Sequence, residues 1–578
     1  MNSSGRLSAA QLDRAAGVLL GTAAGDALGA GYEFSYPAAD AEVDLIGGGP
    51  FGFAPGEWTD DTSMAIAVAR VSATGADLRE SAALDAVAAG FGEWFAGGPR
   101  DVGNQTRAVL AHNSTTAAQM QARAAALTGR TGGNGSLMRT AVVGLAYLGD
   151  AAGCAEAAAQ VSRLTHADER AVQACQLWSH AIRYAVLTGT FDGVRDYLSR
   201  HPELASFWGP LLEQAETGEP SDFPHNGWVV HALQTAWWAI TRAAARDCTH
   251  LQQALELCVR AGHDTDTTAA IAGGLLGARW GASAVPQRWR RMLHGWPGMT
   301  ARNLVALGVL TARGGADDAD GWPSVPRMDY TRWDNGNVAV HPHDGGVLLG
   351  GADAVAAGGF DVEVALCRMG SADPGHERVE VWLIDADDAN PNLAFVLDDA
   401  ARTVQTLRAE GKRVLLHCVQ GRSRTPTVAA RYAQLLAQDP DQVLTAMPWA
   451  QPRTELWDAV VGENPTGTGR RDLEPTPEPV SVQIYEQDNL FVSAHIRDDG
   501  DLEIAGQDLS PPEAFGDEYE YFISVKTTDI PTVVAALGGQ PGDDILVLLK
   551  AHGEQIVSGG EQKWLRSLGI EPDLHTWW

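Results

Sequence analysis

The first half of the chain carries its apolar residues at the spacing of helices. Between about residues 10 and 312, segments such as SAALDAVAAGFGEWFAG and GWVVHALQTAWWAITRAA place them at positions i, i+3, i+4 and i+7. Gly, Pro and Asp separate these segments, and the alternation of β-branched residues that is typical of strands is almost absent. The pattern predicts a single all-α domain over residues 10–312.

The pattern changes after RGGADDADGWPSVPRM, whose Gly, Asp and Pro content predicts a linker at 313–328. Short apolar runs then alternate with helical segments, which predicts an α/β domain over 329–460. A Pro-rich polar stretch predicts a second linker at 461–480. Four alternating segments and two helical ones predict a small α+β domain over 481–578. No cluster there suggests catalysis, so an interaction or regulatory module is the default.

Composition limits the kinds of partner. The chain has 42 Lys and Arg against 73 Asp and Glu, a net charge of −31, so affinity for nucleic acid or anionic membrane through bulk charge is not expected. No apolar run approaches the length of a membrane span, and the N-terminus lacks the features of a signal peptide. The six cysteines form no CxxC pair, which indicates reduced thiols. These features favour a cytoplasmic protein, and the Ala- and Gly-rich, Lys-poor composition favours a bacterial source.

Two acidic clusters open predicted helices. Thr59-Asp60-Asp61 precedes one apolar helix, and Asp264-Thr265-Asp266-Thr267 precedes another. Simple capping explains one Asp or Thr per helix, whereas adjacent carboxylates repel unless a cation neutralises them. Carboxylate and hydroxyl oxygens are hard ligands that suit Mg²⁺ or Mn²⁺ better than zinc. From spacing alone, capping and metal binding both stay open.

Six blocks resemble the ADP-ribosylglycohydrolases and occur in the order of that family. They are GVLLGTAAGDALGAGYEF (17–34), EWTDDTSMA (57–65), GGNGSLMRTAVVG (132–144), THADERAVQAC (165–175), GWVVHALQTAWW (227–238) and AGHDTDTTAAIAGGLLGA (261–278). The resemblance implies an all-α orthogonal bundle with a binuclear Mg²⁺ or Mn²⁺ centre. It also implies hydrolysis of an N- or O-glycosidic bond to ADP-ribose.

The resemblance also implies roles for individual residues. The metal ligands would be Thr59, Asp60, Asp61, Asp264, Asp266 and Thr267. Glu33 would position or activate water from a loop near the metals. The substrate-binding residues would be Gly133, Asn134, Gly135, Ser136, Met138, His166 and Asp168. Trp228 stands where a smaller Tyr or Phe is expected, which leaves specificity for the acceptor open.

A second motif lies in the α/β region. Cys418 and Arg424 have the C-x5-R spacing that lets a loop curl around one phosphate, between a predicted strand and a predicted helix. Such a loop favours a thiolate nucleophile, and the arginine would clamp two phosphate oxygens. The motif resembles the cysteine-based, dual-specificity-type protein phosphatases. That resemblance implies a general acid, for which Asp387, 31 residues before Cys418, is the first candidate and Asp385 and Asp388 are alternatives.

These observations predict a metal-dependent hydrolase that removes ADP-ribose from a modified protein, nucleic acid or small molecule. The phosphatase-like domain would act on a phosphorylated protein or a phosphorylated ADP-ribose product, or would bind phosphate without catalysis. The alternatives are a phosphatase, or a signalling scaffold, whose first domain only binds ADP-ribose.

Overall fold

The computed structural model describes residues 7–38, 41–111, 116–462, 482–487, 490–496, 501–508, 519–540, 543–570 and 572–577. The chain divides into two compact units, Met1–Asn464 and Pro465–Trp578. The linker predicted at 461–480 lies outside the described residues from 463 onward. Its first residue, Val461, ends α20 (Thr454–Val461).

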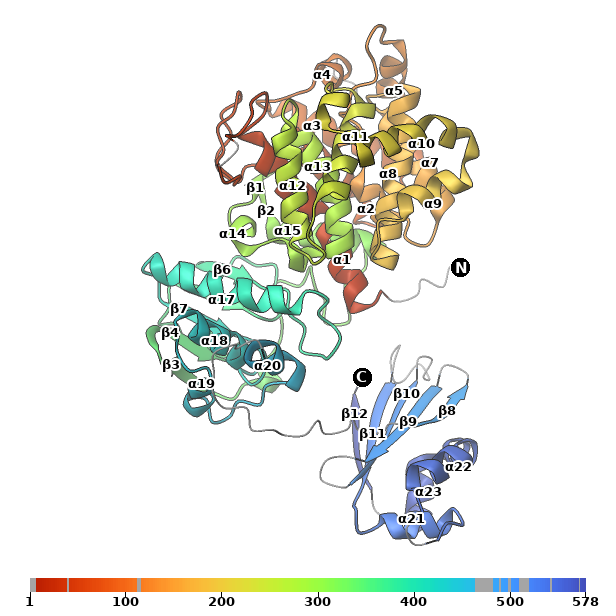
Figure 1. Ribbon diagram of the computed structural model, residues 1–578, viewed down its shortest axis with the longest axis vertical. Helices are drawn as coiled ribbons and strands as arrows, with labels where there is room; N and C mark the ends of the chain where they lie inside the picture. Colours follow the sequence, from red (N-terminus) through yellow and green to blue (C-terminus); the bar gives the residue numbers. More distant parts are fainter. Residues whose placement is uncertain are drawn as a thin grey trace. The chain divides into compact units, whose positions relative to one another are not determined.

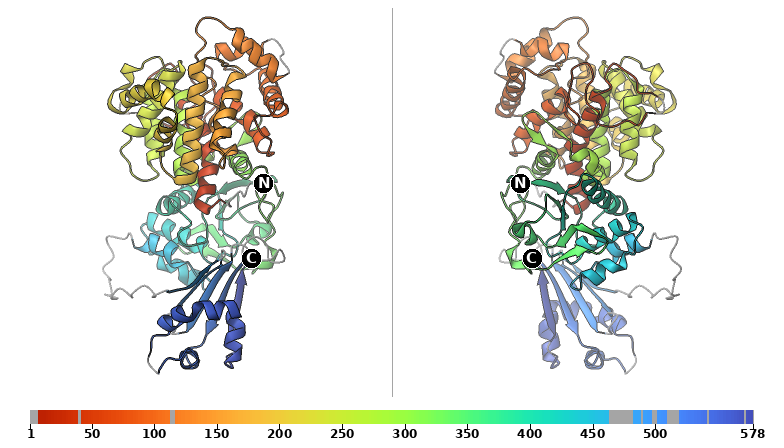
Figure 2. Two further views of the ribbon diagram at one scale, coloured as in Figure 1. Left: turned by 90° about the vertical axis from the view of Figure 1, so that its right-hand side faces the viewer. Right: turned by 90° about the vertical axis from the view of Figure 1, so that its left-hand side faces the viewer.

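Helices dominate the first 312 residues, as Figures 1 and 2 show in red to yellow-green. They are α1 (Ala9–Ala30), α2 (Asp60–Ser72), α3 (Ser81–Ala96), α4 (Asn104–Leu110), α5 (Ala117–Ala126), α6 (Ala141–Ala146), α7 (Ala151–Arg163), α8 (Glu169–Thr188), α9 (Gly193–Arg200), α10 (Pro202–Thr217), α11 (Val229–Arg242), α12 (His250–Ala261), α13 (Thr265–Trp280), α14 (Gln287–Arg290) and α15 (Ala301–Ala312). The short strands β1 (His294–Gly295) and β2 (Met299–Thr300) pair antiparallel. The prediction of a helix-rich domain here is confirmed. Among the described helices, none combines the length and the hydropathy that crossing a bilayer requires.

Helices α1 and α13 pack backbone to backbone at the centre of the bundle. A Cβ atom on Gly21 would lie 2.3 Å from the carbonyl oxygen of Gly273, and one on Gly29 would lie 2.4 Å from the Cα of Asp266. Only glycine permits so close an approach of two backbones. The contact therefore holds the end of α1 beside the start of α13, where the second acidic cluster lies.

An α/β domain follows within the same unit. Its strands are β3 (Val338–His341), β4 (Asp344–Gly350), β5 (Val362–Ala365), β6 (Glu377–Glu380) and β7 (Val414–His417), in the sheet order β3-β4-β7-β5-β6. All neighbours pair parallel except β3 and β4. Its helices are α16 (Ala354–Ala357), α17 (Leu393–Ala409), α18 (Arg424–Leu435), α19 (Asp441–Ala446) and α20. Parallel strands end at one edge of the sheet, so the loop from β7 to α18 lies where such folds bind ligands.

The helical bundle and the α/β domain contact each other directly. Arg291 pairs with Glu377 at 2.8 Å, and Arg302 pairs with Glu380 at 3.0 Å. The segment predicted as a linker at 313–328 is folded against the α/β domain. Asp318 in that segment pairs with Arg368 at 2.6 Å, and Trp322 is 4% exposed.

The described residues of the second unit form one antiparallel sheet and three helices. The strands are β8 (Val482–Gln487), β9 (Leu490–Ile496), β10 (Leu502–Asp508), β11 (Tyr519–Val525) and β12 (Asp573–Trp577), in the order β12-β11-β10-β9-β8. Helices α21 (Ile530–Ala536), α22 (Ile545–Gly559) and α23 (Glu561–Ser567) cover one face of the sheet in Figure 1. Strands and helices share one apolar core.

Candidate functional site

The ends of three helices meet at the first acidic cluster. Asp26, near the end of α1, accepts hydrogen bonds from the backbone nitrogens of Thr59 and Thr62, each at 2.9 Å. These bonds cap α2, whose N-cap residue Thr59 makes no side-chain capping bond of its own. Asp26 therefore supplies the cap that α2 needs, and Asp61 is not required for capping. Sequence reasoning missed Asp26, although it belongs to the GDALG block.

Carboxylates from α1, α2 and the start of α13 come together here. Oxygens of Asp26, Asp61 and Asp266 lie within 4.8 Å of one another, and so do oxygens of Glu33, Asp264 and Asp266. The predicted threonines border the same space. Thr59 Oγ1 donates to Asp61 Oδ2 at 3.1 Å, and Thr267 Oγ1 lies 3.4 Å from the same oxygen. Asp60 is 8% exposed but belongs to neither of the two groups.

Burial and mutual repulsion both disfavour ionisation of these carboxyl groups. Burial, followed by the charges of Asp101, Asp264 and Asp60, raises the pKa of Glu33 to about 9. Burial and the neighbouring carboxylates raise the pKa of Asp60, Asp61 and Asp266 well above the usual range.

Nothing described in the protein neutralises the cluster. Among the described residues, no salt bridge joins it to Lys or Arg, and Asp61 Oδ1 and Glu33 Oε2 are buried without a hydrogen-bond partner. Buried, unpartnered carboxylate oxygens that lie close together fit a divalent cation.

Asp101 is a second residue that sequence reasoning missed. It lies half-buried in the loop between α3 and α4, and its charge raises the pKa of both Glu33 and Asp60. Burial and the charge of Asp264 raise its own pKa to about 6. No local pattern in the sequence marks it, because the surrounding GGPRDVG reads as an ordinary loop.

The predicted glycine loop lies beside the acidic cluster. Asn134 Nδ2 donates to Asp264 Oδ2 at 2.8 Å, which connects the loop to the start of α13. His166 packs against the loop, because a Cβ atom on either Gly133 or Gly135 would lie 3.3 Å from its Nε2. Ser136 accepts a hydrogen bond from Ser162 and is buried.

The imidazole of His166 is held in one orientation. Arg139 donates to Thr165 Oγ1 at 2.7 Å, and this hydroxyl in turn lies 2.7 Å from His166 Nδ1. This bond forms with either tautomer of the ring and turns Nε2 toward the glycine loop. Burial and the charge of Arg139 lower the pKa of His166 to about 3, so the neutral form is retained.

Two predicted substrate-binding residues have structural roles in this fold. Met138 is 3% exposed and packs in the core of the bundle. Asp168 is the N-cap of α8 and accepts from the backbone nitrogen of Arg170 at 2.9 Å. Its carboxyl carbon also lies 3.5 Å from the position of a Cβ on Gly132, at the start of the glycine loop.

The second predicted site lies at the carboxyl edge of the parallel sheet. Cys418 follows β7 and is 2% exposed, and Arg424 begins α18. Arg424 Nη1 donates to the carbonyl oxygens of Leu366 at 2.6 Å and Leu383 at 3.1 Å, both on segments that follow neighbouring strands. The arginine is thereby held at the loop.

The three candidate acids of this site differ in their contacts. Asp385 accepts from Ser423 Oγ at 2.7 Å and lies 3.6 Å from Arg424 Nε. The side chain of Asp387 is 60% exposed and lies 3.7 Å from Arg453. The backbone N–H of Asp388 donates a hydrogen bond to the Glu455 carboxylate. The structure thus places Asp385, rather than Asp387, against the Cys418 loop.

Comparison with known proteins identifies the helical part. The family model described as ADP-ribosylglycohydrolase matches residues 7–318, more than half of the chain. The chain belongs to the ADP-ribosylglycohydrolase family.

Characterised relatives agree with this assignment. The glycohydrolase domain is 30% identical over 289 residues to the ADP-ribosylarginine hydrolase Tri1 of Pseudomonas putida (strain GB-1). The aligned region covers 48% of this chain and 73% of that protein. It is also 30% identical over 294 residues to the ADP-ribosyl-[dinitrogen reductase] glycohydrolase of Rhodospirillum rubrum, covering 48% of this chain and 89% of that protein.

Two solved structures are similar to parts of the chain. One is titled an ADP-ribosylglycohydrolase-related protein complex, with 29% identity, a TM-score of 0.43, and coverage of 53% of this chain and 99% of that one. The other is human DUSP28, with 27% identity, a TM-score of 0.18, and coverage of 21% of this chain and 88% of that one.

Trp228 borders the glycine loop of the glycohydrolase domain. Its side chain is 41% exposed, and its indole Nε1 lies 3.1 Å from the position of a Cβ on Gly132. The ring also contacts His231, with ring centroids 4.9 Å apart. A Cβ at Gly132 would crowd the indole, so the indole and the glycine together shape this side of the loop.

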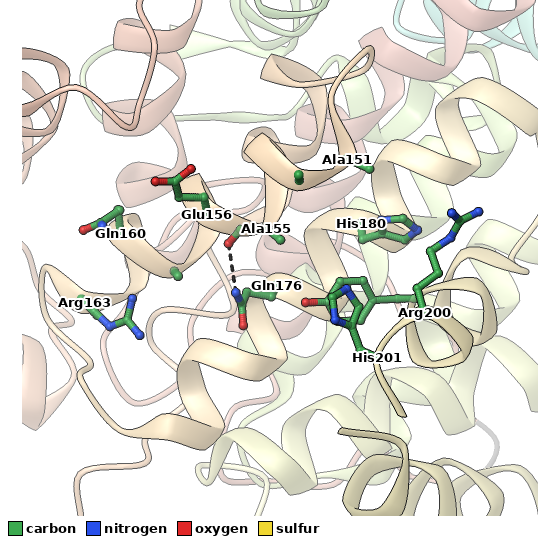
Figure 3. Close-up of a pocket in the computed structure, with 12 residues that line it drawn as sticks. Ala151, Ala155, Glu156, Gln160, Arg163, Gln176, His180, Arg200 and His201 are labelled. Atoms are coloured by element: carbon green, nitrogen blue, oxygen red, sulfur yellow. Dashed lines mark hydrogen bonds between the residues drawn. The ribbon is translucent and has the colours of Figure 1, made fainter. Parts of the chain in front are cut away.

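A separate cavity of about 560 Å³ lies between α7, α8 and α9 of the glycohydrolase domain. Figure 3 shows His180, Arg200 and His201 on one side of it and Glu156, Gln160 and Arg163 on the other. His180 Nε2 is bonded to Asp196 at 2.8 Å. None of the site residues predicted from sequence lines this cavity.

Proposed function

We propose that the glycohydrolase domain is a metal-dependent hydrolase that removes ADP-ribose from arginine side chains of modified proteins. One observation carries this proposal. Two sets of three carboxylates meet where α1, α2 and α13 come together, and no described Lys or Arg pairs with them. The names of two relatives, which refer to ADP-ribosylarginine and to dinitrogen reductase, support the linkage and the class of target.

The cation site is proposed from the residues that fit it. Asp61, Asp266, Asp264, Thr59 and Thr267 would hold one or two Mg²⁺ or Mn²⁺ ions, with Asp60 at the border. When bound, such ions orient the ribose hydroxyls and make water more acidic.

The side chains and backbone around the cluster have separate roles in the proposed reaction. With cations bound, the repulsion that keeps Glu33 protonated would be offset, and the ionised Glu33 would then align the attacking water and take its proton, since it stands at the edge of the acidic cluster with one carboxylate oxygen free. His166 Nε2 and the backbone of Gly133–Gly135 would face the diphosphate. Asn134 fixes the carboxylate of Asp264 at 2.8 Å. Positive charge that develops at the anomeric carbon is stabilised by the surrounding carboxylates.

The direct test measures release of free ADP-ribose by the full chain. Arg-, Ser- and nucleic-acid-linked substrates are compared, each with Mg²⁺, with Mn²⁺ and with a chelator. Asp264→Asn is expected to lower release more than about 100-fold, because even partners of metal ligands contribute about 10- to 100-fold. Asp192→Asn, the same change at an exposed position in this domain, serves as the matched control.

Two results would contradict the proposal. Release that continues unchanged in chelator would exclude the cation. A folded protein that binds ADP-ribose but releases it from no substrate would favour the alternative, a scaffold that only recognises ADP-ribose.

We also propose a second activity, a cysteine-dependent phosphatase, for the domain that contains Cys418. It is supported by the position of Cys418 after a parallel strand, with Arg424 and Asp385 beside the loop. The thiolate attacks phosphorus, the bond to the leaving oxygen breaks, and an aspartic acid protonates that oxygen. Water then cleaves the sulfur–phosphorus bond. The spacing favours Asp387 as the acid, whereas the contacts favour Asp385.

A phosphate-release assay tests this second activity. Phosphate release from p-nitrophenyl phosphate and from ADP-ribose-1″-phosphate is measured for the parent and for Cys418→Ser, which should abolish it. Comparing Asp385→Asn with Asp387→Asn then identifies the acid. Absence of release from both compounds by the parent would leave a domain that binds phosphate without catalysis.

A further inference from the structure

The loop between β6 and α17 carries all three candidate acids of the phosphatase-like domain, and we call its residues 381–392 the acid loop. Asn390 closes this loop on itself. Its side-chain nitrogen donates to the carbonyl oxygen of Ile384, and its side-chain oxygen accepts from the backbone nitrogen of the same residue, each at 2.8 Å. Asp385 follows Ile384 directly and accepts from Ser423 at 2.7 Å. A shift of the closed loop would therefore move the carboxylate of Asp385 with it.

The first end of the acid loop is held by the glycohydrolase domain. Glu380, the last residue of β6, pairs through its carboxylate with Arg302 of α15 at 3.0 Å. Its carbonyl oxygen accepts from Nε2 of Gln287, the first residue of α14, at 2.9 Å. The backbone nitrogen of Gln287 also donates to Asp399 of α17 at 2.9 Å, and Trp382 packs against the apolar core of the bundle. One glutamine of the glycohydrolase domain thus contacts both elements that flank the loop.

The other end of the acid loop is held through Asn392, the N-cap residue of α17. An asparagine at this position usually caps its own helix, but here the side chain makes no capping bond. Its Nδ2 instead donates to the carbonyl oxygen of Trp280, the last residue of α13, at 2.6 Å and to Ser283 Oγ at 2.8 Å. Ser283 in turn donates to the carboxylate of Asp13 on α1, from Oγ at 2.5 Å and from its backbone nitrogen at 2.9 Å. This end of the loop is therefore connected to the first helix of the bundle.

These bonds are suited to fix a position and not only to join two domains. Asp13, Ser283 and Asn392 are all buried. A buried hydrogen bond forms only at a defined distance and direction, so a network whose members are satisfied specifies one arrangement. Apolar contact is not directional and would hold the domains together without that precision.

We propose that the glycohydrolase domain holds the acid loop of the phosphatase-like domain in the position needed for proton transfer, with Asn392 as the positioning residue. This inference rests on the proposed phosphatase activity and makes phosphate release a property of the two domains together. As the bond between phosphorus and the leaving oxygen breaks, the acid on the loop must lie within hydrogen-bond reach of that oxygen to give it a proton. Loss of the Asn392 contacts would misplace the acid, whereas the thiol of Cys418 does not depend on them.

The test compares two phosphate esters that differ in their need for an acid. Phenyl phosphate releases a phenol whose pKa is about 10, as for tyrosine, whereas p-nitrophenyl phosphate releases a much more acidic phenol. Asn392→Leu keeps the volume of the side chain and removes its amide. In this variant of the full chain, kcat for phenyl phosphate should fall about 10- to 100-fold, the effect of misplacing a catalytic group by about 1 Å. The value for p-nitrophenyl phosphate should change little.

Ser283→Ala makes the same test from the other domain. It removes a hydroxyl of the glycohydrolase domain and leaves the sequence of the phosphatase-like domain intact. A selective fall for phenyl phosphate should again follow, smaller than in Asn392→Leu because the bond to Trp280 remains. Arg291→Gln is the matched control, since Arg291 pairs with Glu377 and Glu410 at the ends of β6 and α17 that lie away from the acid loop. It weakens the same domain interface and should leave both rates unchanged.

Hydrogen exchange follows the acid loop independently of activity. The backbone amides of residues 381–392 should exchange faster in Asn392→Leu than in the parent, and no faster in Arg291→Gln. Unchanged exchange of the loop, or a kcat that is unaffected or falls equally for both esters in Asn392→Leu, would overturn this inference and leave the proposed activity intact. If the parent releases phosphate from neither ester, the proposed activity fails, and exchange alone decides whether the glycohydrolase domain holds the loop.

Discussion

The carboxylate of Asp26 on α1 lies 2.9 Å from the backbone nitrogen of Thr62 on α2, and this bond connects the two helices that border the acidic cluster. The other carboxylate oxygen of Asp26 binds the nitrogen of Thr59 at the same distance. One side chain thus both caps α2 and stands within 4.8 Å of Asp61 and Asp266. One residue thus combines the capping of α2 with a place in the acidic cluster.

Replacement of Asp26 by alanine should affect both roles. Loss of two capping bonds to buried nitrogens is expected to lower the free energy of unfolding by about 2 kcal/mol. Cation affinity and ADP-ribose release should fall together. Thermal unfolding, metal titration and the release assay measure these effects. Asp85→Ala, which removes one capping bond at the start of α5, should lower stability without changing cation affinity. Normal release by a folded Asp26→Ala protein would contradict the shared role.

Stability in the absence of cation should fall as the pH rises. The folded state raises the pKa of Glu33 to about 9 and that of Asp26 to about 6, so it holds more protons than the unfolded chain between about pH 4 and 9. An excess of protons in the folded state means that unfolding becomes easier as the pH increases. The melting temperature in chelator should therefore drop by several degrees from pH 5 to pH 9, and Mg²⁺ or Mn²⁺ should remove most of that drop. Parallel curves with and without cation would argue against a metal at this cluster.

Much of the candidate site could be predicted from the sequence because its residues lie in short motifs at the starts of helices. Thr59, Asp61, Asp264 and Asp266 come from two such motifs, and the structure brings them together. Asp101 could not be predicted in this way, since it lies in the loop between α3 and α4, far from Glu33 in the sequence, and only the fold brings the two together. The sequence favours Asp387 as the general acid, whereas the structure places Asp385 against the loop. The reason is similar, because spacing in a loop does not determine which carboxylate contacts Ser423.

In the fold, too, elements that depend on local pattern were predicted, and an element that depends on distant pairing was not. Helical periodicity predicted the helix-rich first domain, which needs only local pattern. The strand β12 (Asp573–Trp577) was not predicted, because it is short and owes its structure to pairing with β11, about fifty residues earlier in the chain.

The glycine contact between α1 and α13 should be sensitive to a single methyl group. Gly21→Ala would place a Cβ atom 2.3 Å from the carbonyl oxygen of Gly273, so the two helices must separate. We expect a loss of about 2–3 kcal/mol in the free energy of unfolding, by overpacking of a tight core. Gly92→Ala, in α3 where a Cβ would meet no atom within 4 Å, should instead stabilise the protein by about 0.5–1 kcal/mol. Chemical denaturation of both variants measures the contrast, and equal effects would refute the backbone contact.

Removal of the charge of Asp101 should shift the pH dependence of ADP-ribose release. Asp101 raises the pKa of Glu33 through its negative charge, so Asp101→Asn is expected to lower that pKa and to move the acidic limb of the kcat/KM profile to lower pH. Cation affinity should weaken several-fold, because one carboxylate fewer faces the cluster. Release measured at saturating Mn²⁺ separates these two effects. Asp192→Asn, at an exposed position of the same domain, is the control and should leave the profile in place. An unshifted profile in Asp101→Asn would show that Glu33 does not set the acidic limb.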